Sequence, residues 1–171
     1  MSVQLDATLH LARALREGVR AQNPPPEEGA PSAEQGVVYL SLVSGTRGYL
    51  EKVVHQINGS YSQGWYDACA VMIRRLIETL IIECYEAHGI AHKIKGQSGD
   101  FLFLRDLVGK MLDEPTWNLG RAARRALPKL KDVGDKSAHS RRYNAHRRDI
   151  DGLKDDLRQV VQELVSLAGL K

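Results

Sequence analysis

The stretch of residues 62–88 constrains this chain most, because its apolar side chains recur at helical spacing along the whole segment. The apolar face covers more than half of the helix circumference, a breadth typical of a helix at the centre of a domain. One face carries Trp65, Cys69, Met72, Ile73, Leu76, Leu80 and Cys84, and the face is widened by Val71, Ile77, Ile81 and Ile82. We therefore expect a central helix that ends where Gly89 can adopt the left-handed conformation.

Further helical patterns flank this central segment. Apolar spacing predicts helices over residues 49–57, 101–111 and 117–127, with an interruption or restart at Pro128 before Gly134. A long closing helix is predicted over residues 150–167. Alternating patterns typical of strands are nearly absent, so the chain belongs to the all-α class, as a bundle of four or five helices.

The N-terminal part is organised differently from the rest. Residues 1–22 predict an amphipathic helix, with a narrow apolar stripe formed by Leu5, Leu9, Ala12, Leu15 and Val19. Residues 23–36 hold four of the six prolines and no large apolar side chain, which is the composition of a flexible linker. The helical bundle then spans residues 37–171, and the tethered helix is expected to dock at a distance within the same chain, on another subunit or on a partner protein.

Composition excludes several classes of protein. Two cysteines in 171 residues cannot form a disulfide framework, and both lie in the apolar pattern of the central helix. No segment approaches the roughly 18 uninterrupted apolar residues of a membrane span, and no secretory leader pattern begins the chain. We therefore expect a cytoplasmic protein that has no contact with membranes.

Signals for cofactors and metals are weak. The chain contains no phosphate-binding loop, dinucleotide fingerprint or nucleophile elbow. Cys84, His88 and His92 recur at four-residue intervals, but Gly89 interrupts this helix and no fourth ligand is evident. We expect no cofactor and no metal site.

The charge of the chain is concentrated in one segment. The whole sequence carries a formal net charge of only +3, yet residues 121–148 contain ten basic residues against Asp132 and Asp135, a net charge of +8. Like charges at this density repel each other unless an anion binds, so the segment predicts an anionic partner. His139 and His146 add two groups that titrate near neutral pH.

Two backbone geometries are open for this basic segment. If it is helical from Ser137 onward, one face carries His139, Arg142, Tyr143 and His146. In a regular helix Arg141 would lie about 140° around the axis from His146, too far to share a phosphate. Those two side chains can meet only if the backbone before Asn144 is not helical, for instance with Asn144 as an N-cap.

The chain resembles the HEPN superfamily of small helical bundles over about residues 60–170. The motifs that carry the resemblance are YDACAVMIRRLIETLIIECYEAHG, FLFLRDLVGKML and LKDVGDKSAHSRRYNAHRRDIDGL, followed by a C-terminal helix. More narrowly, it resembles an uncharacterised bacterial branch that is often joined to restriction and defence proteins. The resemblance implies a homodimer, and many members are metal-independent endoribonucleases with an Arg and a His four to six residues apart.

Two placements of that motif are possible here. Arg141 and His146 match the ribonuclease spacing directly. The uncharacterised branch instead shows a basic residue, then Gly-Asn, then Ala-Ala-His, and this pattern matches Lys131, Gly134, Asp135, Ala138 and His139, with Asp in place of Asn.

The resemblance and the charge together predict an RNA- or nucleotide-binding domain, with metal-independent RNA cleavage in antiviral defence or as a toxin. The expected catalytic residues are Arg141, His146 and His139. The residues expected to bind nucleic acid are Arg121, Arg124, Arg125, Lys131, Lys136, Arg142, Tyr143 and Arg147. The alternative is a non-catalytic dimerisation or adaptor module that binds a partner protein.

Overall fold

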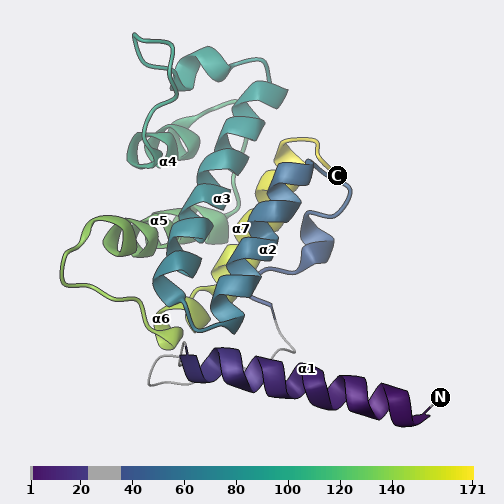
Figure 1. The fold of residues 1–171 in the computed structure, drawn as a ribbon. Helices are drawn as coiled ribbons and strands as arrows, with labels where there is room; N and C mark the ends of the chain where they lie inside the picture. Colours follow the sequence, from purple (N-terminus) through teal and green to yellow (C-terminus); the bar gives the residue numbers. More distant parts are fainter. Residues whose placement is uncertain (1, 23–35) are drawn as a thin grey trace.

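The computed structural model describes residues 2–22 and 36–171, and the described chain is all-helical (Figure 1). Its helices are α1 (Ser2–Gln22), η1 (Leu40–Leu42), α2 (Gly48–Ser62), α3 (Tyr66–Ala87), η2 (Ala91–Ile94), α4 (Leu104–Asp113), α5 (Arg121–His139), α6 (Arg147–Asp151) and α7 (Lys154–Leu167). Within these residues the β structure is limited to one isolated bridge between Lys95 and Phe101. The predicted all-α helical bundle is confirmed.

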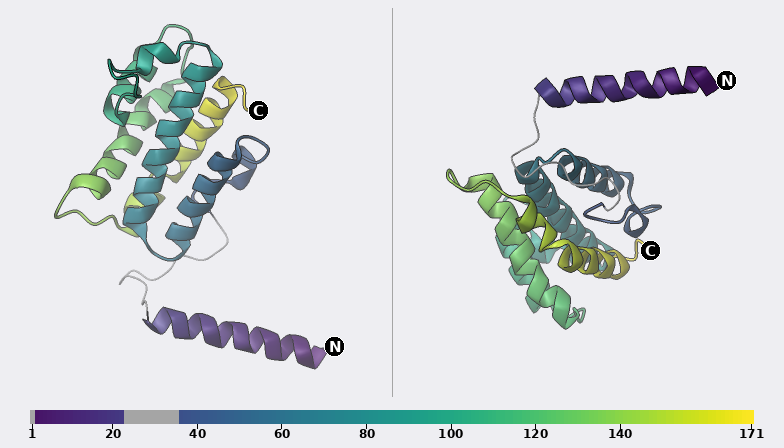
Figure 2. Two further views of the ribbon diagram at one scale, coloured as in Figure 1. Left: turned by 45° about the horizontal axis from the view of Figure 1, so that its top comes forward. Right: turned by 90° about the horizontal axis from the view of Figure 1, so that it is seen from below.

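Helix α3 lies at the centre of the bundle, as its broad apolar face predicts. It packs against α2, α5 and α7, and the shorter α4 covers its C-terminal half (Figures 1 and 2). Leu76, Ile77, Leu80 and Ile81 have no exposed surface. Burying each such side chain stabilises the fold by about 1.5–3 kcal/mol, so this helix organises the core.

The predicted central helix begins later than its pattern indicated. Helix α3 starts at Tyr66, and Trp65 is the N-cap residue with 58% of its surface exposed. Val71 is also exposed, at 37%. The expectation that both side chains face the core is therefore wrong, because no other helix of the described chain covers this side of α3 near its N-terminus.

Helices α3 and α5 approach each other closely at Gly134. A Cβ atom at this buried glycine would lie 2.5 Å from Cβ of Arg74 and 3.1 Å from the carbonyl oxygen of Ala70. Beside this contact, Arg74 Nε donates to Asp135 Oδ1 at 2.9 Å. Lys131 Nζ lies 2.9 Å from the other oxygen of the same carboxylate. This crossing determines which face of α5 turns toward solvent.

Helix α5 runs without a break through Pro128, where an interruption was expected. Pro128 is exposed, so the hydrogen bond that proline cannot donate is missing on the side where water reaches the free carbonyl group. The expected start at Trp117 is also wrong, because the helix begins only at Arg121. Trp117 instead packs edge-on against Tyr85, with ring centroids 4.8 Å apart.

The predicted closing helix is divided into α6 and α7. Gly152 and Leu153 form a turn between them, in which the N–H of Leu153 donates to the carbonyl of Ile150 at 3.0 Å. Glycine has a low helix propensity, which favours the break at this point. The apolar spacing continues across the turn because Ile150, Leu153 and Leu157 all reach the core.

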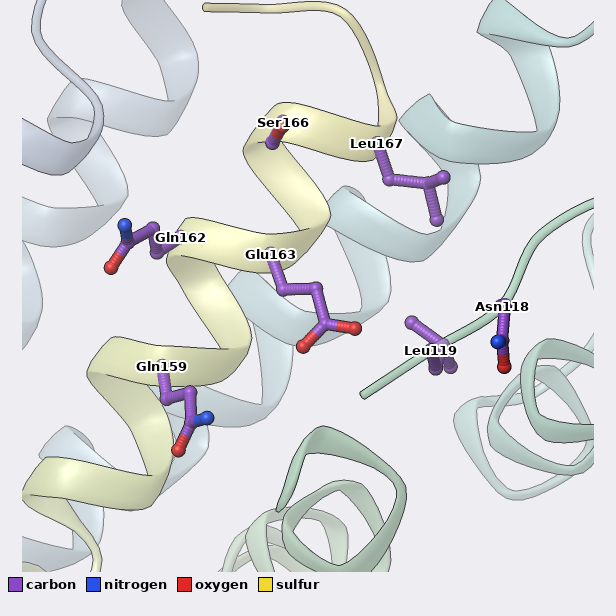
Figure 3. Close-up of a pocket in the computed structure, with 7 residues that line it drawn as sticks. All are labelled: Asn118, Leu119, Gln159, Gln162, Glu163, Ser166 and Leu167. Atoms are coloured by element: carbon purple, nitrogen blue, oxygen red, sulfur yellow. The ribbon is translucent and has the colours of Figure 1, made fainter. Parts of the chain in front are cut away.

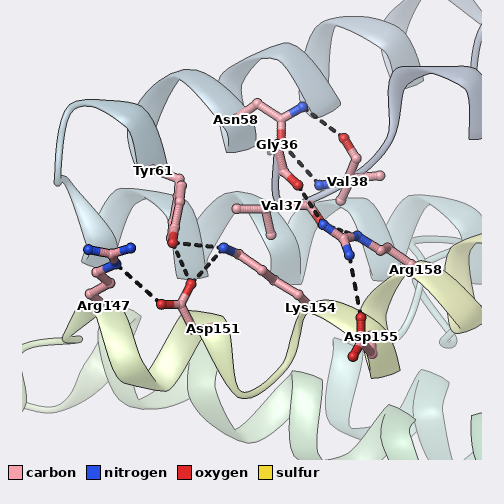
Figure 4. Close-up of polar contacts among 10 residues, drawn as sticks. All are labelled: Gly36, Val37, Val38, Asn58, Tyr61, Arg147, Asp151, Lys154, Asp155 and Arg158. Atoms are coloured by element: carbon pink, nitrogen blue, oxygen red, sulfur yellow. Dashed lines mark hydrogen bonds and ion pairs between the residues drawn. The ribbon is translucent and has the colours of Figure 1, made fainter. Parts of the chain in front are cut away.

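The bundle begins at Gly36, where polar contacts attach the chain to α2 and α7 (Figure 4). The guanidinium of Arg158 donates to the carbonyl oxygens of Gly36 at 2.8 Å and of Val37 at 3.1 Å. The amide of Asn58 accepts from the N–H of Val38 and donates to its carbonyl oxygen. Most of the predicted linker, residues 23–35, lies outside the described residues.

Helix α1 is a separate element of the described chain (Figures 1 and 2). Its Leu9, Leu11 and Leu15 are 48%, 61% and 63% exposed. The helix predicted at this position is confirmed, and its leucines contact no other described helix enough to be buried. Neither α1 nor any other helix of residues 2–22 and 36–171 has the length and apolar character needed to cross a membrane.

Candidate nucleic-acid interface

Helix α5 has one apolar face and one basic face. Its core face carries small and aliphatic side chains, which are Ala123, Ala126, Leu127 and Leu130. Arg121, Arg125, Lys136 and His139 lie on the opposite, exposed face, at spacings of 4, 11 and 3 residues. At 1.5 Å per residue this face is about 27 Å long from Arg121 to His139.

Seven basic residues of the 121–148 segment are exposed and make no ion pair with any residue that the structure describes. We call this set the cationic surface: Arg121, Arg124, Arg125, Lys136, Arg141, Arg142 and Arg148. The only acidic side chain on the exposed face of α5 is Asp132, which pairs with Lys131 at 2.9 Å. Uncompensated like charges raise the local positive potential, and this favours an anionic ligand.

Two residues expected to bind nucleic acid are engaged in ion pairs within the protein. Lys131 contacts both Asp132 and Asp135, and only 17% of its side chain is exposed. Hydrogen bonds to these two carboxylates raise the pKa of Lys131 above its ordinary value. Arg147 Nε lies 3.2 Å from Asp151 Oδ2. Both side chains therefore have roles in holding α5 and α6 in place.

The segment of residues 140–146 between α5 and α6 is not helical. Helix α5 ends at His139, and the N-cap of α6 is His146, where Asn144 was the suggested cap. The shared helical face expected for His139, Arg142, Tyr143 and His146 therefore does not form. The second geometry, in which the backbone before Asn144 leaves the helix, is the one that the chain adopts.

Two carboxylates from different helices hold segment 140–146. Asp67 of α3 accepts a hydrogen bond from the N–H of Ala145 at 2.9 Å. Asp149 of α6 accepts from the N–H of His146 at 2.9 Å and from the hydroxyl of Tyr143 at 3.1 Å. Burial, and then the hydrogen bond to Asp149, raise the pKa of Tyr143 to about 12, so this hydroxyl stays protonated.

Neither of these carboxylates was identified from the sequence as part of the site. Asp149 had a local signal, since it stands three residues after the N-cap, where an acidic side chain commonly bonds back to the cap. Asp67 had none, because its partner Ala145 is 78 residues away along the chain.

The three expected catalytic residues lie at or within the connection between α5 and α6. His139 is the last residue of α5, Arg141 follows two residues later, and His146 precedes α6. All three are exposed to solvent. His139 ends α5, and Arg141 and His146 belong to the non-helical segment 140–146 that follows it, so the two histidines flank this connection.

A polar cluster connects α6 with α2 and α7 (Figure 4). Lys154 Nζ lies 2.6 Å from Asp151 Oδ1 and donates to the Tyr61 hydroxyl at 2.7 Å. The same ammonium group lies 4.1 Å from the centre of the Tyr61 ring. Burial opposes ionisation of Asp151, but hydrogen bonds from Lys154 and Tyr61 outweigh it and lower the pKa of this carboxyl group.

Two surface pockets are lined by residues outside the cationic surface, and Leu119 of the first lies two positions before Arg121. The first, of about 480 Å³, is lined by Asn118, Leu119, Gln159, Gln162, Glu163, Ser166 and Leu167 (Figure 3). The second, of about 400 Å³, is lined by Arg47, Tyr49, Glu83, Glu86, Ala87 and Ala168. None of the residues expected from the sequence to be catalytic or to bind nucleic acid lines either pocket.

Cys84 and His88, whose spacing was a weak signal for a metal site, contact backbone carbonyl groups. Nδ1 of His88 lies 2.8 Å from the carbonyl oxygen of Cys84, and the Cys84 thiol contacts the carbonyl of Leu164 at 3.4 Å. Within the part of the chain that the structure describes, no group of three or more His, Cys, Asp or Glu side chains is placed to hold a metal ion.

Comparison with known proteins gives no match: no family model, curated protein or solved structure is similar to this chain.

Proposed function

We propose that this protein is a HEPN-like, cytoplasmic RNA-binding domain that contacts the RNA backbone through the cationic surface. The observation that carries the proposal is the set of seven exposed basic residues without an ion-pair partner among the described residues. Phosphate groups are the anions best matched to such a surface, because arginine offers paired donors in a planar arrangement.

The measurement is the RNA affinity of the full chain across a salt series. Displacement of bound counterions makes the affinity fall as salt rises, with a slope that counts the phosphates neutralised. Arg125→Glu and Arg142→Glu are each expected to weaken binding and to reduce that slope by about 1 or more. Arg105→Glu in α4 is the matched control, since Arg105 is an 80% exposed arginine outside the cationic surface.

Two results contradict the proposal. One is an affinity that does not depend on salt. The other is a loss of affinity in Arg105→Glu equal to the loss in the two variants of the cationic surface.

Cleavage of the bound RNA is a further candidate activity, supported by the non-helical segment 140–146. This backbone removes the helical geometry that would keep Arg141 and His146 on different faces. In the proposed reaction the 2′-oxygen of the ribose bonds to phosphorus, and the bond from phosphorus to the 5′-oxygen breaks. A base takes the proton of the 2′-hydroxyl, an acid gives one to the departing 5′-oxygen, and arginine stabilises the charge on the phosphate.

The test of cleavage is incubation of labelled RNA with the protein in EDTA. We expect a product that ends in a 2′,3′-cyclic phosphate, and a large loss of its formation in His146→Ala or His139→Ala. Cleavage that persists unchanged in both variants, or that is absent from the wild-type protein, contradicts a catalytic role for these histidines.

The second candidate function is that of a dimerisation or adaptor module, and the exposed leucines of α1 favour it. A solitary helix with three leucines in water gains stability when a partner covers them. If the partner is a second copy of this chain, light scattering gives the mass of a dimer for the wild type and of a monomer for Leu11→Glu/Leu15→Glu. A monomeric wild type contradicts homodimerisation through α1.

A further inference from the structure

Trp65 combines an exposed side chain with a fixed backbone. The residue is 58% exposed, although tryptophan is usually well covered. Its N–H donates to the carbonyl of Ser60 at 2.9 Å, and its own carbonyl accepts from the N–H of Cys69 at 2.9 Å. The backbone that carries the indole is therefore held by α2 on one side and by α3 on the other.

Trp65 lies at the start of α3, the end of the helix that holds the segment carrying Arg141 and Arg142 through Asp67. Asp67 is two positions further along the chain, so the Cα atoms of Trp65 and Asp67 are at most about 7 Å apart. Asp67 in turn accepts the hydrogen bond from Ala145, three residues after Arg142. The start of α3 also packs against α6 (Figure 1).

Other exposed aromatic side chains of the described chain lie elsewhere or are already in contact. Phe103, 81% exposed, precedes α4 beside the other half of α3 (Figure 1). The guanidinium of Arg158 covers the ring of Tyr39 at 4.0 Å, and the hydroxyl of Tyr49 donates to Glu83. Of these exposed aromatic residues, Trp65 is thus the one at the helix end that contacts the segment between α5 and α6.

We infer that Trp65 stacks against an unpaired base of single-stranded RNA whose phosphates lie on Arg141 and Arg142. This inference rests on the proposed function and names the class of its substrate. A basic surface next to an open aromatic ring is the arrangement with which proteins bind single strands, because every base has a face that can stack. In a duplex the bases already stack on each other, so an indole gains nothing from them.

The test compares a fluorescein-labelled 12-residue oligoadenylate with a 12-base-pair RNA duplex by fluorescence anisotropy. Trp65→Ala is expected to weaken binding of the single strand about 5- to 150-fold, the range that loss of one base–aromatic stack produces. Its affinity for the duplex stays within about twofold of wild type. Phe103→Ala, which removes an exposed aromatic ring at the start of α4, leaves both affinities unchanged.

Trp65→Tyr tests whether the effect is one of stacking. This variant keeps an aromatic face, so it is expected to retain most of the affinity for the oligoadenylate and to lose the quenching of tryptophan emission expected when the wild type is titrated. A loss of affinity as large as that of Trp65→Ala overturns the inference, since it would then reflect a disturbed backbone.

The remaining outcomes separate the inference from the proposed function. If Arg142→Glu weakens binding while Trp65→Ala behaves like Phe103→Ala, RNA binding stands and the role of Trp65 is overturned. If polyglutamate binds as tightly as the oligoadenylate and Trp65→Ala weakens both equally, the partner is an acidic protein and the inference is overturned. If neither RNA binds the wild type, the proposed function itself fails.

Discussion

Replacing Gly134 by alanine tests how closely α3 and α5 must approach. The new Cβ atom would lie 2.5 Å from Cβ of Arg74, whereas non-bonded carbon atoms prefer separations of about 3.5–4.0 Å. The two helices must therefore move apart by about 1 Å at their crossing. Such overpacking costs about 1–3 kcal/mol, and it displaces the neighbouring ion pair between Arg74 and Asp135.

The matched control is Gly109→Ala in α4. Gly109 is also helical, but it is exposed, and a Cβ atom there would meet no heavy atom within 4 Å. Alanine improves helix propensity by about 1 kcal/mol in both variants, so this contribution cancels in the comparison. Gly109→Ala is expected to raise the free energy of unfolding by about 0.5–1 kcal/mol. The free energy of unfolding of Gly134→Ala is expected to be about 1–3 kcal/mol lower than that of Gly109→Ala.

Urea unfolding followed by circular dichroism at 222 nm measures both free energies of unfolding. The slope of the free energy of unfolding against urea concentration should be the same in the two variants, because both expose the same surface area when they unfold. Equal stabilisation by the two alanines would refute the reasoning, since it would mean that the helices approach less closely at Gly134 than the structure has them.

Three further predictions concern stability and reactivity. Arg158→Ala should lower the free energy of unfolding by about 1.5–3 kcal/mol and speed hydrogen exchange at Val37, because two backbone carbonyls lose a charged donor; unchanged exchange contradicts this. Burial raises the pKa of Asp135, but hydrogen bonds from lysine and arginine outweigh it and lower the pKa overall. The stabilisation that ionised Asp135 provides is thus present above about pH 4, and it is lost as the pH falls through the pKa of Asp135 in the folded protein, which is lower than in the unfolded chain. Asp135→Asn should therefore destabilise the protein at pH 7 and hardly at pH 2. Burial raises the pKa of Cys69 and Cys84 to about 12, so an aromatic disulfide reagent at pH 8 should modify them only after unfolding in urea.

The ion pairs within the basic segment explain why charge alone did not identify the available cations. Lys131 and Arg125 look alike in the sequence, yet Lys131 faces Asp132 and Asp135 and Arg125 has no ion-pair partner among the described residues. Whether an acidic neighbour reaches a lysine depends on the face of the helix that each occupies and on the helix packed beside it. The density of charge was readable from the sequence, but the pairing was not.

The sequence by itself determined the helical class, the central place of α3 and the position of the basic segment. These features depend on the spacing of side chains along one helix, which is a local property that periodicity reveals. The predicted end at Gly89 is also local: this residue has φ of +69°, a conformation in which glycine carries no steric penalty.

Only the tertiary structure decided the arrangement around residues 140–146. The chain leaves the helix there because Asp67, from a helix far away in sequence, and Asp149 satisfy the backbone N–H groups of Ala145 and His146. It likewise decided that Trp65 is exposed, because whether an apolar residue is buried depends on whether another helix covers it. Long-range contacts of this kind leave no period in the sequence, so they become visible only when the helices are packed together.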